Sequence, residues 1–281
     1  MKNAAGVQLR FWGVRGSIPT PAPENLGFGG NTTCLELRLA NGDVVVIDGG
    51  TGAHKLGLSL VDGPQGRAAN LHFLMTHFHW DHIQGIPFFA PLYNASNHVT
   101  FHSRREPEAV REILEGQMTH PYFPVNFELL AAKRDFVRLT EEPLRYGELV
   151  VRSFPLNHPQ GATGFRLESH GAVIVHACDH EHGDPKLDRI LLEHAEDADV
   201  LVYDAQFTPE EYVSKQGWGH STWLEATRIA REAKVKQLVL THHDPSHNDE
   251  MLAAVVTEAR AEFENTNAAR EGWAIEIEGR V

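Results

Sequence analysis

The run from His77 to His82, which reads His-Phe-His-Trp-Asp-His, constrains this chain more than any other feature. It places three imidazoles and a carboxylate within six residues. Imidazole nitrogen and carboxylate oxygen are ligands for zinc and for slightly harder ions such as manganese. The apolar stretch from Leu71 to Met75 precedes the run and is typical of a strand. We therefore expect the histidines to leave the end of a sheet on a tight loop, held by the sheet but open to solvent and substrate.

Composition sets broad limits on the rest of the chain. Its 281 residues, 42% of them hydrophobic, are enough to bury a full core, and we expect a single domain over residues 1–281. A membrane span is not predicted, because no run of about 18 apolar residues is present. The first ten residues lack the apolar region of a secretory signal. Cys34 and Cys178 lie in apolar surroundings and are expected to be buried free thiols, which favours the reducing cytoplasm.

The net charge limits the kinds of partner. A formal charge of −13 argues against a broad surface for nucleic acid, because affinity for phosphate backbones depends heavily on lysine and arginine. No long nucleic acid is therefore expected as a partner. A small anionic substrate remains compatible with this charge, since bound cations can dominate the local field of a site.

Polar residues stand where predicted strands end. Strands are predicted at 8–12, 34–39, 44–47, 71–75, 149–154, 164–167, 172–177, 200–203, 237–240 and 273–277, with a tight turn at Asn41-Gly42. Helices are predicted at 54–60, 104–117 and 249–264, and another is expected to begin with Ser221 as its N-cap and to run through Lys234. Five strands lead directly to a histidine or an aspartate, namely His77, His158, Asp179, Asp204 and His242. Ionisable residues at the strand ends of one sheet edge are the usual layout of an active site in an α/β protein.

In this order, the motifs resemble those of the metallo-β-lactamase superfamily, whose fold is an α/β four-layer αββα sandwich. Within that superfamily, the sequence Gly219-His220-Ser221-Thr222, followed later by Thr241-His242, is similar to ribonuclease Z-like phosphodiesterases. The opening stretches from Gly13 to Thr20 and from Gly29 to Cys34 also resemble the N-terminal part of that group.

One departure from ribonuclease Z is informative. Those enzymes carry a long arm that clamps tRNA, between the third metal histidine and the bridging aspartate. Here His158 and Asp179 are separated by 21 positions, which two short predicted strands already occupy. The chain therefore resembles the armless phosphodiesterases of the superfamily, which act on small substrates and include cyclic-nucleotide phosphodiesterases. True class B β-lactamases are a poorer match, because they are secreted and lack the Gly-His-Ser-Thr element.

The resemblance implies two divalent metal ions, zinc or manganese, and a ligand set for each. The first site would consist of His77, His79 and His158; the second of Asp81, His82 and His242; and Asp179 would bridge the two. Two cations about 3.5–4 Å apart can share a hydroxide and hold both sides of an in-line displacement at phosphorus. His243 competes with His242 for the last position, but His242 directly follows Thr241, and the alternation of a strand turns His243 the other way.

The same resemblance suggests further roles at the site. His220 would protonate the leaving oxygen, and Asp204 would orient its imidazole. The alternative is that His220 only hydrogen-bonds Asp81, which is itself both a ligand and part of the catalytic set. Asp48 is expected to support the histidine loop rather than to bind metal. Finally, three loop residues are candidates to contact phosphate or base, with an ordinary solvated loop as the alternative: Arg15, Asn31 and Thr32.

The leading functional hypothesis is a dinuclear metal phosphodiesterase for a small phosphodiester, with a 3′,5′-cyclic nucleotide as the preferred substrate. Hydrolysis would use a metal-bridged hydroxide with His220 as general acid. A ribonuclease Z-like RNA endonuclease is the first alternative, and a hydrolase of carbon esters, lactones or thioesters is the second. A metal- or nucleotide-binding sensor without turnover is a fourth reading. Dimers are common in the group that the chain resembles, so a homodimer is compatible with this reading.

Overall fold

The computed structural model describes residues 6–39, 42–62 and 70–279 and contains two seven-stranded sheets packed face to face. The strands of the first sheet, in spatial order, are β14 (Ala274–Ile277), β1 (Val7–Gly13), β2 (Cys34–Arg38), β3 (Val44–Ile47), β4 (Asn70–Leu74), β5 (His98–Ser103) and β6 (Lys133–Arg138). Those of the second are β13 (Thr266–Ala268), β12 (Gln237–Thr241), β11 (Val200–Asp204), β10 (Ala172–Ala177), β9 (Ala162–Ser169), β8 (Leu149–Leu156) and β7 (Leu144–Tyr146).

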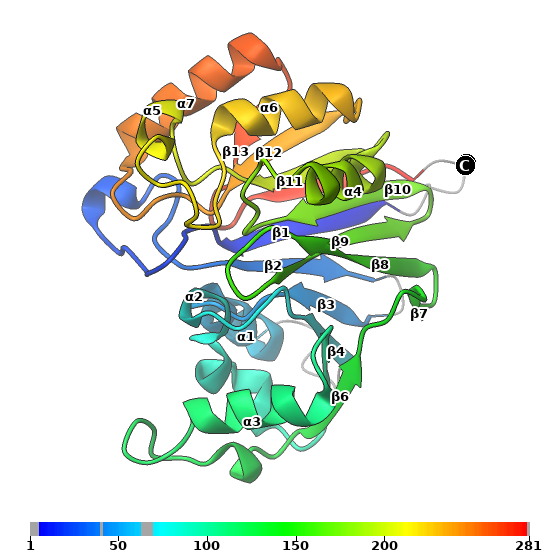
Figure 1. Ribbon diagram of the computed structural model, residues 1–281. Helices are drawn as coiled ribbons and strands as arrows, with labels where there is room; N and C mark the ends of the chain where they lie inside the picture. Colours follow the sequence, from blue (N-terminus) through cyan, green and yellow to red (C-terminus); the bar gives the residue numbers. More distant parts are fainter. Residues whose placement is uncertain (1–5, 40–41, 63–69, 280–281) are drawn as a thin grey trace.

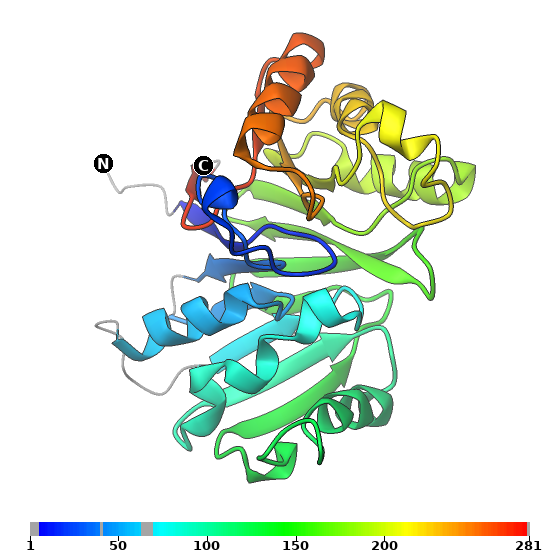
Figure 2. The ribbon, with the colours of Figure 1, turned by 90° about the vertical axis from the view of Figure 1, so that its left-hand side faces the viewer.

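Helices cover the outer face of each sheet. The first sheet carries α1 (Gly52–Asp62), α2 (Trp80–Ile83) and α3 (Pro107–Gln117), while the second carries α4 (Pro185–Ala195), α6 (Trp223–Glu232) and α7 (Asp249–Glu262), with the short α5 (Pro209–Tyr212) nearby. Figures 1 and 2 show these helices above and below the paired sheets. The 3-10 turns are η1 (Pro23–Asn25), η2 (Ile86–Phe88), η3 (Ala90–Tyr93) and η4 (Phe127–Leu129). The predicted αββα sandwich is confirmed.

Three apolar layers hold the sandwich together. The central layer lies between the sheets and includes Phe11, Leu74 and Val202. Phe73 belongs to the layer under α1 and α3, and Leu238 to the layer under α4, α6 and α7. Because each inner strand is buried on both faces, it reads as a nearly continuous apolar run, as Val44–Ile47 does.

The sheet topology brings the ends of several strands to one edge. Strands β3 to β6 run parallel, as do β10 to β13, and β8 has the direction of β10 because β9 lies antiparallel between them. The carboxyl ends of parallel strands meet at the same edge of a sheet. The ends of β8, β10, β11 and β12 therefore lie together, opposite the ends of β3 and β4 in the other sheet.

Several predicted elements differ from the observed ones in detail. The helix that was expected from residue 104 begins at Pro107, since proline suits the first helical turn, where its missing N–H is not needed. The N-cap of α6 is Thr222 rather than Ser221, and the Thr222 side chain accepts the N–H of Glu225. Asn41 of the predicted turn lies outside the described residues, whereas Gly42 has φ of 90°.

Cys34 and Cys178 are buried free thiols, as expected. Among the described helices, none combines the length and the apolar character that a membrane crossing requires.

Candidate metal centre

The first group of predicted ligands is a trio of histidines. His77 and His79 lie on the loop after β4, and His158 lies just beyond the end of β8. Nδ1 of His79 is 3.1 Å from Nε2 of His158, and the ring of His77 is centred 4.4 Å from His79 and 4.8 Å from His158. Three imidazoles this close would repel one another if protonated, but their lone pairs can share one cation.

The carbonyl of Gly219 fixes the orientation of His158. Nδ1 of His158 donates to this oxygen at 2.8 Å, so Nε2 remains the nitrogen that faces His79. Gly219 has φ of 87°, and a Cβ at this position would lie 2.3 Å from Nδ1 of His158. Only glycine suits this backbone conformation and this close approach.

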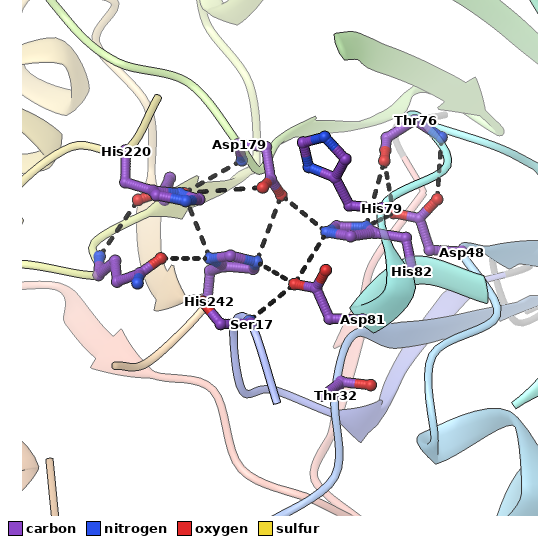
Figure 3. A network of polar contacts seen from close by, with 12 residues as sticks. Ser17, Thr32, Asp48, Thr76, His79, Asp81, His82, Asp179, His220 and His242 are labelled. Carbon is purple, nitrogen blue, oxygen red and sulfur yellow. Dashed lines mark hydrogen bonds and ion pairs between the residues drawn. The ribbon is translucent and has the colours of Figure 1, made fainter. Parts of the chain in front are cut away.

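The second group consists of Asp81, His82 and His242. Oδ2 of Asp81 lies 3.1 Å from Nε2 of His242 and 3.4 Å from Nε2 of His82. His82 is fully buried, and Asp81 and His242 are nearly so. Figure 3 shows the three side chains converging from α2 and from the end of β12. One carboxylate and two imidazoles facing a common point form a ligand set for zinc or a similar divalent ion.

Asp179 lies between the two groups, as predicted for a bridging residue. Its Oδ1 is 3.8 Å from Nε2 of His77 and 3.7 Å from Nε2 of His158. Its Oδ2 is 3.1 Å from Nε2 of His82 and 3.4 Å from Nε2 of His242. Each carboxylate oxygen therefore faces one of the two groups.

Acceptors behind the histidines select their tautomers. Nδ1 of His82 donates to Asp48 at 2.8 Å, and Nδ1 of His242 donates to the Gln206 side chain at 3.0 Å. The Thr76 hydroxyl donates to Asp48 at 2.7 Å and lies 3.1 Å from Nδ1 of His77. In each case Nε2 is left to face the cluster, which is how metal-binding histidines are usually oriented. Asp48 thus supports the loop, as expected (Figure 3).

Buried atoms without partners show that the cluster suits a cation. Among the described residues, Nε2 of His77, Nε2 of His82 and Oδ2 of Asp179 are buried without a conventional hydrogen bond, and they meet the rest of the cluster only as ion pairs, such as the 3.1 Å pair between His82 and Asp179. An unsatisfied buried polar atom is costly, and so native structures rarely contain several together. Divalent cations would satisfy all three.

The pKa directions reflect the same arrangement. Burial and the neighbouring imidazole of His82 lower the pKa of His77 well below its ordinary value. Burial opposes ionisation of Asp179, but the imidazoles of His242 and His82 outweigh it and hold the carboxyl pKa well below its usual range. Burial also opposes protonation of His242, but Asp179 and Asp81 raise its pKa to about 9. The cluster therefore keeps its carboxylates charged, as metal binding requires, and a cation that bound here would displace the proton of His242.

His220 is paired with Asp204, as predicted. Nδ1 of His220 lies 2.9 Å from Oδ2 of Asp204, which leaves Nε2 of the imidazole available to the site. The other oxygen of Asp204 accepts the N–H groups of Ser221 and Gln206, so the carboxylate is rigidly held. The alternative partner, Asp81, is bonded to Ser17 and His242 instead.

The structure separates His242 from His243. Nε2 of His242 faces Asp81, whereas Nε2 of His243 donates to the carbonyl of Ala269, away from the cluster. This agrees with the choice of His242 as the predicted ligand.

The three residues predicted to contact the substrate make contacts within the protein instead. Arg15 is fully buried and donates to the carbonyls of Gly29 and His247, and Thr32 is fully buried beside the N–H of Thr51. Neither side chain is exposed at the site in this structure, so their role as substrate contacts stays a prediction that their burial does not favour. The Asn31 side chain donates to Glu271 at 2.9 Å. The sequence places these residues on loops but does not show that the loops fold inward.

Sequence reasoning also missed residues that shape the site. The backbone N–H of Ser17 donates to Asp81 at 2.7 Å, from a glycine-flanked loop. Gly16 precedes it, and a Cβ there would lie 2.5 Å from the ring of His242. Gln206 could have been suspected, because it stands two positions beyond Asp204 at a strand end.

Residues 40–243 match the family model described as "Beta-lactamase superfamily domain". Among curated proteins, the chain is 25% identical over 248 residues to ribonuclease Z of Bacillus mycoides, an alignment covering 70% of this chain and 78% of that protein. It is 23% identical over 331 aligned positions to ribonuclease Z of Methanosarcina mazei, covering 96% of this chain and 98% of the relative.

Solved structures show the same fold. The metallo-β-lactamase fold protein YhfI from Bacillus subtilis is 20% identical, with a TM-score of 0.73, and the match covers 97% of this chain and all (100%) of that one. Human tRNase Z, short form, is also 20% identical, with a TM-score of 0.67, covering 96% and 99% of the two chains. Yeast PDE1 is 13% identical, with a TM-score of 0.61, again covering 96% and 99%.

Proposed function

Since the chain belongs to the β-lactamase superfamily and is a metal-dependent hydrolase, we propose that it is a two-metal phosphodiesterase whose substrates are small phosphodiesters, first among them 3′,5′-cyclic nucleotides. One observation carries this proposal. Seven ligand-type side chains converge beside a histidine that is paired with a buried carboxylate, the His220–Asp204 pair at 2.9 Å. Hydrolysis of a phosphodiester with a poor leaving group needs both an activated nucleophile and an acid.

Different residues of the site would bind the metal ions and transfer the proton in the proposed hydrolysis. When bound, two divalent ions would supply an activated water and would polarise the phosphoryl oxygens. His77, His79 and His158 would hold one ion, Asp81, His82 and His242 the other, and Asp179 would be shared. His220 would hold a proton on Nε2 and transfer it to the leaving ribose oxygen, while Asp204 stabilises the charged imidazole from the Nδ1 side.

The short interval between His158 and Asp179 supports a small substrate. Strands β9 and β10 occupy it, and only the turn at His170-Gly171 joins them. No extension that could clamp a folded RNA arises here. The net charge of −13 agrees, because RNA binding would require a basic surface.

Turnover of a panel of phosphodiesters tests the proposal. The purified protein would be supplied with Zn²⁺ or Mn²⁺ and offered four 3′,5′-cyclic nucleotides, 2′,3′-cyclic AMP, bis(4-nitrophenyl) phosphate and a short RNA with a 3′ extension. We expect the 3′,5′ rings to open while the RNA remains intact. If no phosphodiester is hydrolysed, the proposal is wrong.

A ribonuclease Z-like endonuclease is the second candidate, favoured by the relatives, which are named ribonuclease Z. Cleavage of the RNA with no turnover of cyclic nucleotides would support it in place of the first.

For either activity we place the enzyme in the cytoplasm, where the free thiols of Cys34 and Cys178 would stay reduced. We also propose that the protein is a homodimer, which gel filtration would detect.

A further inference from the structure

A cavity of about 270 Å³ lies beside the metal centre. Its lining residues are His77, Phe78, His79, Arg105, Ile113, Gln160 and Gly161. Pockets that bury a whole drug-sized ligand usually have volumes of about 300–1,000 Å³, so this one suits part of a substrate, such as a single ring system. Since two of its walls are predicted metal ligands, a group in the cavity would be joined to a phosphate at the metals.

Arg105 gives the cavity an unpaired cation. Arg105 is exposed, and within the described ranges its guanidinium forms no ion pair and no side-chain hydrogen bond; it lies 5.9 Å from the ring centroid of Phe78. The neighbouring Arg104 is different, because it pairs with Glu141 at 2.7 Å and approaches Ser153. In an acidic protein, an arginine left without a carboxylate beside the active site has its donors free for a ligand.

From these residues we infer a nucleobase subsite that selects guanine, an inference that rests on the proposed phosphodiesterase function. Phe78 offers an aromatic ring on which a base can stack. Arg105 offers two parallel N–H groups, which match the O6 and N7 acceptors of guanine, whereas adenine presents a donor at the position of O6. Gln160 adds an amide at the rim, on a backbone with φ of 66°.

A larger cavity, which His158 also lines, is a poorer site for the base. It is lined in part by Glu181, His182 and Tyr212, and contains no arginine or lysine. The carboxylate of Glu181 already accepts the Tyr212 hydroxyl and the N–H groups of Gly217 and Gly219. The carboxylate of Glu181 is therefore used to hold the loop before His220 rather than to select a substrate.

The test compares kcat/KM for cyclic GMP, AMP, UMP and CMP in the wild-type enzyme, Arg105→Gln and Arg104→Gln. We expect the wild type to prefer cyclic GMP over cyclic AMP by about fivefold or more, the range that a bidentate contact provides. Arg105→Gln should abolish or reverse this preference, because glutamine pairs with adenine through N6 and N7. Arg104→Gln, the matched control, should retain both activity and preference.

Two results would overturn the inference while leaving the phosphodiesterase in place. One is a wild type without guanine preference; the other is an Arg105→Gln variant in which all four substrates lose the same factor, because Arg105 would then contact phosphate. If no phosphodiester is hydrolysed, equilibrium binding of guanosine and adenosine 5′-monophosphates decides instead. Tighter binding of the guanosine nucleotide that Arg105→Gln removes would support the subsite, and equal binding would exclude it.

Discussion

Three site residues hold a strained backbone. Asp48, Asp179 and His242 have φ of 59°, 61° and 61°, in the left-handed region that residues other than glycine rarely adopt. Such a conformation costs about 1–3 kcal/mol per residue and persists only where the surrounding structure enforces it. Asp48 and His242 directly follow β3 and β12, and Asp179 stands two positions after β10. The ends of these strands therefore fix the directions in which the three side chains point.

Replacing His220 tests its proposed role as the general acid. We expect His220→Ala to lower kcat for cyclic nucleotides by about 10²–10⁴-fold, the usual contribution of a general acid. Hydrolysis of bis(4-nitrophenyl) phosphate should fall much less, because nitrophenolate leaves without a proton. Metal content, measured by mass spectrometry, should not change.

The comparison between the two leaving groups distinguishes a general acid from a residue with only a structural role. An equal loss on both substrates would show that His220 serves the site only structurally. Asp204→Asn should show the same dependence on the leaving group with a smaller loss, since the imidazole stays in place but loses its charged partner.

His82 tests the second metal position. Its Nδ1 is bonded to Asp48 and its Nε2 faces Asp81 and Asp179, so His82→Ala should lose one of two ions per chain and all measurable hydrolysis. Circular dichroism should show an intact fold. His243→Gln is the matched control, because His243 is equally buried but faces Ala269, and this variant should keep both ions. Activity in His82→Ala would falsify the two-metal mechanism.

At the scale of elements, the sequence predicted most strands of both sheets but missed β6, β7 and β13. It also missed β5, which lies next to β4 in the first sheet. In that strand Val99 and Phe101 alternate with His98, Thr100 and His102, which suggests a strand with a solvated face. In the fold both faces are covered, and His102 accepts the Tyr146 hydroxyl at 2.5 Å. The helix α4 was also missed, although Asp184 and Pro185 are start signals that the structure uses. The local sequence pattern predicts that a strand or helix is present more readily than it predicts which other element packs against it.

The cap of α6 can be tested in isolation. The Thr222 side chain accepts the N–H of Glu225, and so Thr222→Ala should lower the free energy of unfolding by about 1 kcal/mol. Urea denaturation would show this as a lower midpoint with an unchanged slope. Thr222→Ser keeps the hydroxyl and should remain close to the wild type; if both variants lose the same stability, the methyl group rather than the cap is responsible.

At the scale of the molecule, the site joins distant parts of the chain. Asp81 and His242 are 161 positions apart but their side chains lie 3.1 Å from each other, one beside each sheet. The grouping of the predicted ligands could be anticipated, because His158, Asp179 and His242 stand at or just beyond strand ends and the other four follow β4 in a recognisable order. The residues that orient these ligands could not be predicted. Gly219 acts through its carbonyl and Gln206 through its side-chain amide, and the positions of both groups depend on how the two sheets pack.

Buried histidines should make the whole fold sensitive to acid. Burial lowers the pKa of His102 to about 3, of His243 to about 3 and of His176 to about 4. In the unfolded chain a histidine has a pKa of about 6.5, so between these values the unfolded state binds more protons. Stability is therefore lost as pH falls from about 6.5 toward 3, and each such histidine costs about 2 kcal/mol by pH 5.

His102 allows this linkage to be measured, because it contacts Tyr146 and His72 rather than the metal ligands. The free energy of unfolding, from urea denaturation at pH 7.5 and pH 5, should fall by about 2 kcal/mol less in His102→Gln than in the wild type, since one titrating group is gone. His54→Gln, an exposed position on α1, should keep the full loss. If His102→Gln loses as much stability as the wild type, the imidazole of His102 is not held neutral in the folded protein, and the acid sensitivity must come from other groups.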